Sequence, residues 1–207
     1  MQRLGAHPEA VTCMLKTIQD AKHHIVTAFS ISDNHLGSNQ YPPLQGLGQG
    51  NGGAPAGWTA VSTPLINMMR TSGFGINLLS AISTSLLSFV CYAFVDDTDV
   101  AHCSDLYSTA AEIIEKMQDV VDHWEGGLRT TGGALGVNKS FWYLLHFIWR
   151  NNQWSYASKT DSPGELLVRG VSGQREHLKR LEPSEARETL GIWLTMDGNN
   201  KTQVDKM

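Results

Sequence analysis

Two adjacent carboxylates, Asp96 and Asp97, directly follow a run of apolar residues. Like charges this close repel each other, and crowding penalises the ionised form unless a cation compensates. Mg²⁺ typically takes one or two protein carboxylates and fills its remaining octahedral positions with water and substrate phosphates. In two-metal phosphoryl transfer, such ions stabilise both the attacking and the leaving oxygen. The pair therefore indicates a site for Mg²⁺ or Mn²⁺, and an Asp-Asp turn in solvent is the simpler alternative against which the context is weighed.

The elements on both sides of the pair favour a hairpin with the acids at its tip. Residues 86–95 are rich in β-branched and aromatic side chains, and residues 98–103 can return as a partner strand. Residues 105–129 keep apolar side chains at spacings of three and four, which predicts a helix capped by Asp105 and ended by Gly132-Gly133. We expect one apolar stripe of this helix to pack on the sheet that carries the hairpin: Ile113, Ile114, Met117, Val121 and Trp124.

The first third of the chain predicts two helices separated by a loop. Residues 8–28 carry a helical apolar stripe, and residues 30–57 are predicted to be a loop because five of the eight residues 46–53 are glycine. Pro55 suits the first position of the second helix, whereas Pro64 is expected to bend or restart it.

The last third predicts short strands. Residues 140–149 and 154–157 form a hairpin pattern, residues 188–194 predict a further strand, and the tail from Asp197 onward is expected to be frayed. Aromatic side chains of the hairpin can stack on nucleic-acid bases, although packing on one another is the commoner cause of such a run. The residues concerned are Trp142, Tyr143, Phe147, Trp149, Trp154 and Tyr156.

Several short motifs resemble those of reverse transcriptases. Phe94-Val95-Asp96-Asp97 resembles their Tyr-x-Asp-Asp motif, with Phe in place of Tyr as in many non-retroviral members. Gln49-Gly50 resembles the Gln-Gly of the preceding motif, and Pro55 stands where the family often has a helix-opening proline. Residues 133–140 loosely resemble the next palm motif, and Leu190-Gly191 resembles the Leu-Gly before the thumb. The combination resembles the polymerase of non-long-terminal-repeat retroelements.

The resemblance implies an activity and a set of roles. The activity is template-directed addition of deoxynucleotides to a primer 3′ hydroxyl, with Mg²⁺ or Mn²⁺ as cofactor and with template-primer and deoxynucleoside triphosphates as partners. Asp96 would bind the ions and Asp97 would assist. Gln49 and Gly50 would line the nucleotide and template site, Phe94 would pack beneath the primer end, and Lys139 would approach the triphosphate.

The resemblance also implies a fold, and the sequence departs from the family's pattern at two points. We expect an α+β fold, namely a partial right-hand polymerase palm over residues 1–195, with an antiparallel sheet, helices on one face and the start of the thumb connection, followed by a tail over 196–207. The family has a further metal-binding Asp on a strand upstream of the first helix, and no acid here matches it. Gly48 replaces the usual proline before Gln-Gly. Weak metal binding and an inactive isolated chain are therefore expected.

Other readings of the same residues remain open. A non-catalytic retroelement remnant, with weak or no nucleic-acid binding, is the main alternative. Asp97-Thr98-Asp99 also has the Asp-x-Asp form of nucleotide-sugar glycosyltransferases, although no nucleotide-binding βαβ pattern precedes it. His102 and Cys103 with Cys91 lack metal-ligand spacing, and His23-His24 is expected on a solvated helix face.

Composition limits the kinds of partner and the cellular compartment that can be expected. Residues 1–128 hold 5 Lys/Arg against 12 Asp/Glu, whereas residues 129–187 hold 9 against 5, so a phosphate backbone is best accommodated by the second stretch. Residues 76–95 carry no charge, but they hold many polar residues and are not expected to span a membrane. Three cysteines without a Cys-x-x-Cys pair fit a reducing compartment, and an intracellular protein is expected.

Overall fold

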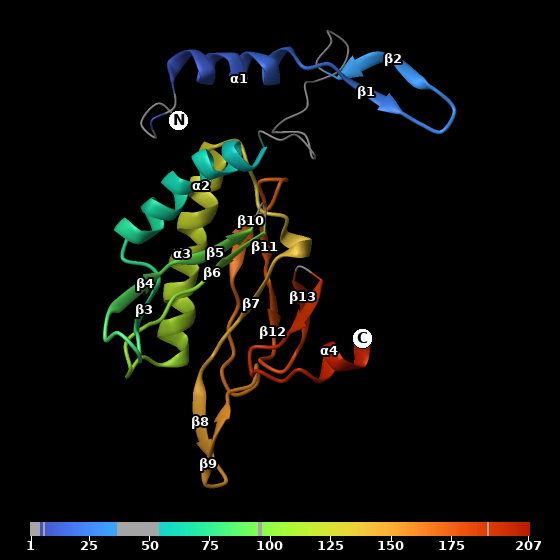
Figure 1. Cartoon of the computed structure of the whole chain (residues 1–207). Coiled ribbons are helices and arrows are strands. Elements are labelled where there is room, and N and C mark those ends of the chain that lie inside the picture. The colour runs from blue at the N-terminus through green and yellow to red at the C-terminus, as the bar shows by residue number, and fades with distance from the viewer. Residues whose placement is uncertain (1–4, 6, 37–53, 95–96, 190) are drawn as a thin grey trace. The chain divides into compact units, whose positions relative to one another are not determined.

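The computed structural model describes residues 5, 7–36, 54–94, 97–189 and 191–207 (Figure 1). The chain divides into two units, Met1–Pro64 with Ala93–Asp97 and Leu65–Tyr92 with Thr98–Met207. The fold mixes helices with small, mostly antiparallel two-stranded sheets, which is compatible with the expected α+β class. None of the helices in the described ranges is both long and apolar enough to cross a bilayer.

The first unit begins with α1 (Pro8–Asp20), followed by the antiparallel pair β1 (His23–Val26) and β2 (Ile31–Leu36). The predicted helix over 8–28 is therefore too long, and the predicted loop from residue 30 contains a strand. The helix ends because Ala21 adopts an extended backbone, after which the β-branched Ile25 and Val26 favour a strand. The glycine-rich residues 46–53 lie outside the described residues.

Helix α2 (Ala54–Thr71) begins one residue before Pro55, the predicted first position, and Pro64 does not interrupt it. A proline removes one intrahelical hydrogen bond, and the remaining turns of this long helix hold it together. The helix ends at Thr71, and the positive φ of 78° at Gly73 allows the backbone N–H of Phe74 to donate to the carbonyl of Met69 at 3.1 Å.

Two pairs of strands follow: β3 (Ile76–Leu79) with β4 (Leu86–Phe89), and β5 (Cys91–Phe94) with β6 (Asp97–Val100). The single strand predicted over 86–95 is thus divided at Val90. This residue is buried, and its carbonyl accepts a hydrogen bond from the N–H of Ala101 rather than from β3. The return strand is also shorter than the predicted 98–103.

Helix α3 (Ala110–Thr130) is the longest helix described, and its cap differs from the predicted Asp105. The hydroxyl of Thr109 accepts from the N–H of Glu112, and the Glu112 carboxylate accepts from the N–H of Thr109 at 2.7 Å. This reciprocal pair is a capping box, which satisfies two free donors of the first turn. Gly132, with φ of 83°, follows the end of the helix as expected.

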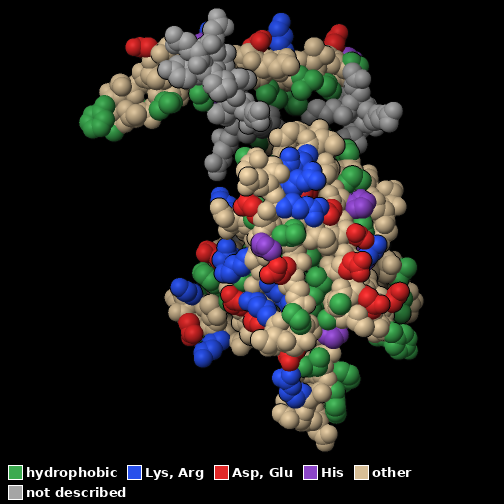
Figure 2. Space-filling model, turned by 180° about the vertical axis from the view of Figure 1, so that it is seen from behind, with side chains coloured by type: hydrophobic (Ala, Val, Ile, Leu, Met, Phe, Trp, Pro, Cys, Tyr) green, Lys and Arg blue, Asp and Glu red, His purple; other side chains and the backbone are tan. Residues whose placement is uncertain are grey.

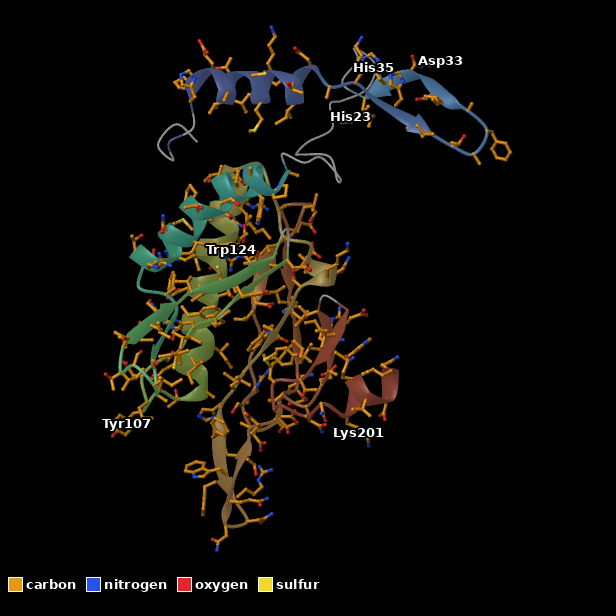
Figure 3. The ribbon with its side chains drawn as sticks, viewed as in Figure 1. His23, Asp33, His35, Tyr107, Trp124 and Lys201 are labelled. Atoms are coloured by element: carbon orange, nitrogen blue, oxygen red, sulfur yellow. The ribbon has the colours of Figure 1, made fainter. Side chains whose placement is uncertain are left out.

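The main described core lies between α3 and the strands β7 (Phe141–Tyr143) and β10 (Leu167–Arg169). Trp124, labelled in Figure 3, is also buried on α3. The predicted apolar stripe is confirmed, because Ile114, Val121 and Trp124 are buried and the other two members pack against this core. The strands of the core cluster are β7 and β10 rather than the β5–β6 pair. Its buried residues are Ile114, Val121, Trp142, Leu144, Leu166, Val168 and Leu178.

The rest of the second unit consists of short elements. The predicted strand over 140–149 is divided into β7 and β8 (Phe147–Arg150), and only β8 pairs with β9 (Gln153–Tyr156). Strand β7 instead pairs in parallel with β12 (Lys179–Leu181). The other elements are the 3-10 helix η2 (Val137–Lys139), β11 (Arg175–His177) paired with β10, the hairpin β13 (Arg187–Thr189) with β14 (Ile192–Leu194), and α4 (Lys201–Lys206).

The C-terminal tail is more ordered than expected. Residues 187–189 and 192–194 pair as two strands where one strand over 188–194 was predicted, and helix α4 occupies the region predicted to be frayed. Gln203 of α4 accepts a hydrogen bond from the N–H of Trp193, and the ammonium of Lys206 lies 5.2 Å from the centre of the Trp193 ring. These contacts attach α4 to β14 and explain its order.

Candidate functional site

The candidate metal centre is built on the strands β5 and β6, which are neighbours in one sheet. Only two residues, Val95 and Asp96, separate the last residue of β5 from the first residue of β6, and both lie outside the described residues. Asp97 opens β6, and its side chain is exposed. The described acid thus stands at the beginning of a strand whose partner ends three residues earlier.

Alternation along β6 puts two carboxylates on the same side of the strand. Asp97 and Asp99 are exposed, whereas Thr98 and Val100 are half-buried, and side chains two apart in a strand share a face. The carboxylates of Asp97 and Asp99 thus lie on the more exposed side of the strand.

The charge of Asp99 also affects Tyr143 of strand β7. Burial raises the pKa of Tyr143, and the negative charges of Glu185 and Asp99 raise this pKa further, while Arg187 opposes them. The hydroxyl of Tyr143 donates to the backbone carbonyl of Glu185 at 3.0 Å. The end of β6 that carries Asp99 consequently lies within electrostatic reach of β7 and of the segment before β13.

The structure describes the other predicted site residues to different extents. Gln49 and Gly50 lie outside the described residues, and for Phe94 the description covers the backbone only, as the last residue of β5. Lys139 is exposed at the end of η2, which is attached to the core through Val137. Within the described ranges, its ammonium has no ion-pair partner.

In the part of the chain that the structure describes, no three His, Cys, Asp or Glu side chains gather in a way that could hold an ion. His102 has a packing role, because its Nδ1 accepts from the N–H of Gly75 at 3.3 Å and its ring meets Phe74 edge-on. Burial lowers the pKa of His102, which favours the neutral ring that this acceptor role requires.

A pair of histidines was missed at the sequence level. His23 and His24, expected on a helix face, belong to β1, where His24 lies opposite His35 of β2 (labelled in Figure 3). The two rings are 5.6 Å apart, and Nδ1 of His24 lies 2.9 Å from the carbonyl oxygen of Ser32. Pairing between two strands brings these residues together, so no pattern within one segment could have indicated it.

The basic stretch over 129–187 is mostly engaged within the protein. Figure 2 shows Lys and Arg side chains intermixed with Asp and Glu over the face in view, rather than gathered in one patch. Most of these cations contact an acid or an aromatic ring of the same unit, so less positive charge remains for a phosphate backbone than composition suggests. The pairs are Arg129 with Glu125, Arg150 with Asp161, Lys159 and Lys179 with Glu185, Arg175 with Asp122, Arg180 with Trp142, and Arg187 with Phe141.

Comparison of the chain with protein-family models, with curated proteins and with solved structures found no match in any of the three. The chemical interpretation of the site therefore rests on the motifs of the sequence together with the arrangement of β5, β6 and β7. Fold alone would not decide the matter in any case, because one fold supports many functions and function resides in the site.

Proposed function

We propose that Asp96 and Asp97 form the metal-binding connection of a reverse-transcriptase-like palm. The parent activity is template-directed DNA synthesis by two-metal nucleotidyl transfer. The observation that carries the proposal is the pairing of β5 with β6, with only two residues between the strands. In this role Asp96 binds Mg²⁺ or Mn²⁺ and Asp97, exposed at the start of β6, assists or orients the ion.

The order of elements around the acids supports the same proposal. The β5–β6 pair is followed by α3, which packs on strands of the unit, and then by η2 with its exposed Lys139. Lys139 would approach the triphosphate of the incoming nucleotide, Gln49 and Gly50 would line its site, and Phe94 would pack beneath the primer end. Template-primer and deoxynucleoside triphosphates are the partners that these roles imply.

The proposed site is incomplete in the 207-residue chain. Two catalytic ions lie about 3.5–4 Å apart, and carboxylates from separate strands are needed to fix both of them. Asp96 and Asp97 are adjacent and hold one ion loosely, because Mg²⁺ normally completes its shell with substrate phosphates. We therefore expect weak metal binding and no measurable polymerase activity in the isolated chain.

Titration with Mn²⁺, followed by water-proton relaxation, tests the metal site directly. The parent chain should bind the ion weakly, and Asp96→Asn and Asp97→Asn should each reduce the bound fraction. Asp105→Asn is the matched control, because Asp105 is an exposed acid outside the β5–β6 pair. Equal signals for the parent and for both variants would exclude these acids as the site. Signals lowered equally by all three variants would indicate general attraction to negative charge.

A second function is favoured by one specific observation, the shared exposed face of Asp97 and Asp99. Two carboxylates in an Asp-x-Asp arrangement suit a Mn²⁺-bound nucleoside diphosphate, as in nucleotide-sugar glycosyltransferases. Mn²⁺-dependent binding of uridine diphosphate that is lost in Asp99→Asn and kept in Asp96→Asn would favour this function. Binding of neither Mn²⁺ nor nucleic acid by a folded chain would favour the non-catalytic remnant.

A further inference from the structure

The β8–β9 hairpin carries four aromatic rings on one face. Cross-strand pairing sets Phe147 opposite Tyr156 and Trp149 opposite Trp154, and side chains two apart in a strand point the same way. Ring centroids lie 4.7 Å apart in the first pair and 5.3 Å apart in the second. We call these four residues the aromatic face.

The aromatic face is largely uncovered. The exposed fractions are 52% for Phe147, 59% for Trp149 and 67% for Trp154, while Tyr156 is half-buried. In Figure 1 the hairpin extends away from the other strands of its unit, and its Asn151-Asn152 turn, with φ of 50° and 61°, closes it tightly. The rings do pack on one another in pairs, as in the commoner cause of such an aromatic run, yet three of them keep more than half of their surface exposed.

The hairpin itself carries no negative charge. Residues 140–160 contain no Asp or Glu, and Arg150 is the one charged residue of β8 and β9. Arg150 follows Trp149 in β8 and therefore points to the opposite face of the hairpin, where its side chain stays 57% exposed although it pairs with Asp161. The aromatic face thus has no carboxylate of the hairpin to repel a phosphate chain.

The side-chain chemistry of this hairpin differs from that of β3–β4, another exposed hairpin of the same unit. The latter presents aliphatic side chains such as Leu79, Ile82 and Leu86, which suit an apolar protein surface. Indoles and phenyl rings instead present flat π-faces, and every nucleic-acid base has a π-face on which such rings stack. The two indoles are already in edge-to-face contact, so a base would stack on an outward ring face rather than between them.

We propose that the aromatic face binds single-stranded nucleic acid by stacking unpaired bases on Trp149 and Trp154. Stacking of this kind tolerates any base sequence, so shape and strandedness rather than sequence decide what binds. This inference goes beyond the proposed polymerase site, because it uses no carboxylate and no metal ion. The two proposals can therefore fail separately.

Fluorescence anisotropy of a labelled oligothymidylate or oligouridylate, measured with EDTA present, tests the inference. Trp149→Ala and Trp154→Ala should each weaken binding roughly five-fold or more. Trp149→Phe should keep most of the affinity because it keeps a ring. The matched control is Tyr107→Ala, which removes a ring that is 93% exposed in the same unit (labelled in Figure 3) and should leave binding unchanged. Circular dichroism checks that each variant is folded.

The alternative occupants give different results. Absence of oligonucleotide binding by the parent, or equal binding by the parent and both Trp→Ala variants, would overturn the inference. Duplex binding as tight as single-strand binding would also overturn it, because paired bases hide their faces. A further outcome in sedimentation is that the Trp→Ala variants lose self-association while oligonucleotide binding is unaffected. In that case the aromatic face binds a second copy of this chain. Asp96→Asn should not change the anisotropy result, which keeps this test separate from the metal site.

Discussion

The side-chain amide of Gln118 in α3 exchanges two hydrogen bonds with the backbone of Leu167 in β10. Its Oε1 accepts from the N–H of Leu167 and its Nε2 donates to the carbonyl of the same residue, each at 2.8 Å. The amide thus takes the place of a neighbouring strand and attaches the helix to β10. This attachment fixes α3 on the core that supports the second unit.

We expect Gln118→Ala to lower the free energy of unfolding by about 2 kcal/mol, because two half-buried backbone groups lose their partner. Urea unfolding followed by circular dichroism measures the change. Glu115→Ala is the control, since Glu115 is exposed on the same helix and its replacement should change stability by less than about 0.5 kcal/mol. Equal stability of the two variants would show that the amide contributes nothing.

Two adjacent glycines in α3 should respond oppositely to alanine. A Cβ on Gly127 would lie 2.8 Å from both Leu65 Cδ2 and Met68 Cε of α2, whereas a Cβ on Gly126 would meet nothing within 4 Å. Gly126→Ala should stabilise by up to about 1 kcal/mol through helix propensity. Gly127→Ala should be less stable than Gly126→Ala by roughly 1–3 kcal/mol, because buried Leu65 has little room to move. Thermal unfolding of both variants distinguishes close packing of the helices from propensity.

The position of the helix cap is testable by a pair of substitutions. Thr109→Ala should destabilise the chain by about 1 kcal/mol, because the N–H of Glu112 loses its acceptor. Asp105→Ala should have almost no effect, since Asp105 lies outside the capping box. If chemical denaturation shows Asp105→Ala to be less stable than Thr109→Ala, Asp105 rather than Thr109 caps the helix.

Asp161 should produce a pH-dependent contribution to stability. Hydrogen bonds from the hydroxyl and the N–H of Ser158, with help from Arg150, lower the pKa of Asp161 from 3.8 to about 2. Because the folded pKa is the lower one, the contribution is complete above pH 3.8 and is lost as the pH falls toward 2. NMR titration of the carboxyl carbon should report this pKa, and Ser158→Ala should raise it. A pKa near 3.8 in both proteins would contradict the hydrogen bonding.

Long amphipathic helices could be predicted from the sequence, whereas their exact ends could not. The stripe of α3 is unmistakable because burial of one face requires the 3.6-residue period. Asp105 and Thr109 are both good caps by residue type, and only the reciprocal contact with Glu112 decides between them. The spacing of Ile25 continues the apolar stripe of α1, so the sequence predicts helix at this residue. Pairing of β1 with β2 overrides that local pattern.

The strand pair around the acids was predictable to the extent that it lies within one segment. An apolar strand followed by a polar return predicts a hairpin, and β5 and β6 are indeed neighbours in one sheet, although Asp97 belongs to β6 rather than to the turn. The effect of Asp99 on Tyr143 and the internal pairing of Arg150, Lys159 and Arg175 depend on contacts between distant segments. Exposure of Trp154 is likewise set by the position of the hairpin in the unit, which composition does not encode.

The most direct test of the proposed polymerase ancestry is primer extension by a fusion of this chain to an upstream palm segment that supplies the acidic strand, assayed with Mg²⁺ and with Mn²⁺. We expect the fusion to extend the primer and its Asp96→Ala variant to lose that extension. The unfused chain should extend the primer no faster than its own Asp96→Ala variant, because incomplete charge stabilisation costs orders of magnitude in rate. A well-folded fusion that extends no primer would contradict the assignment of Asp96 to a polymerase centre, and robust extension by the unfused chain would contradict its incompleteness.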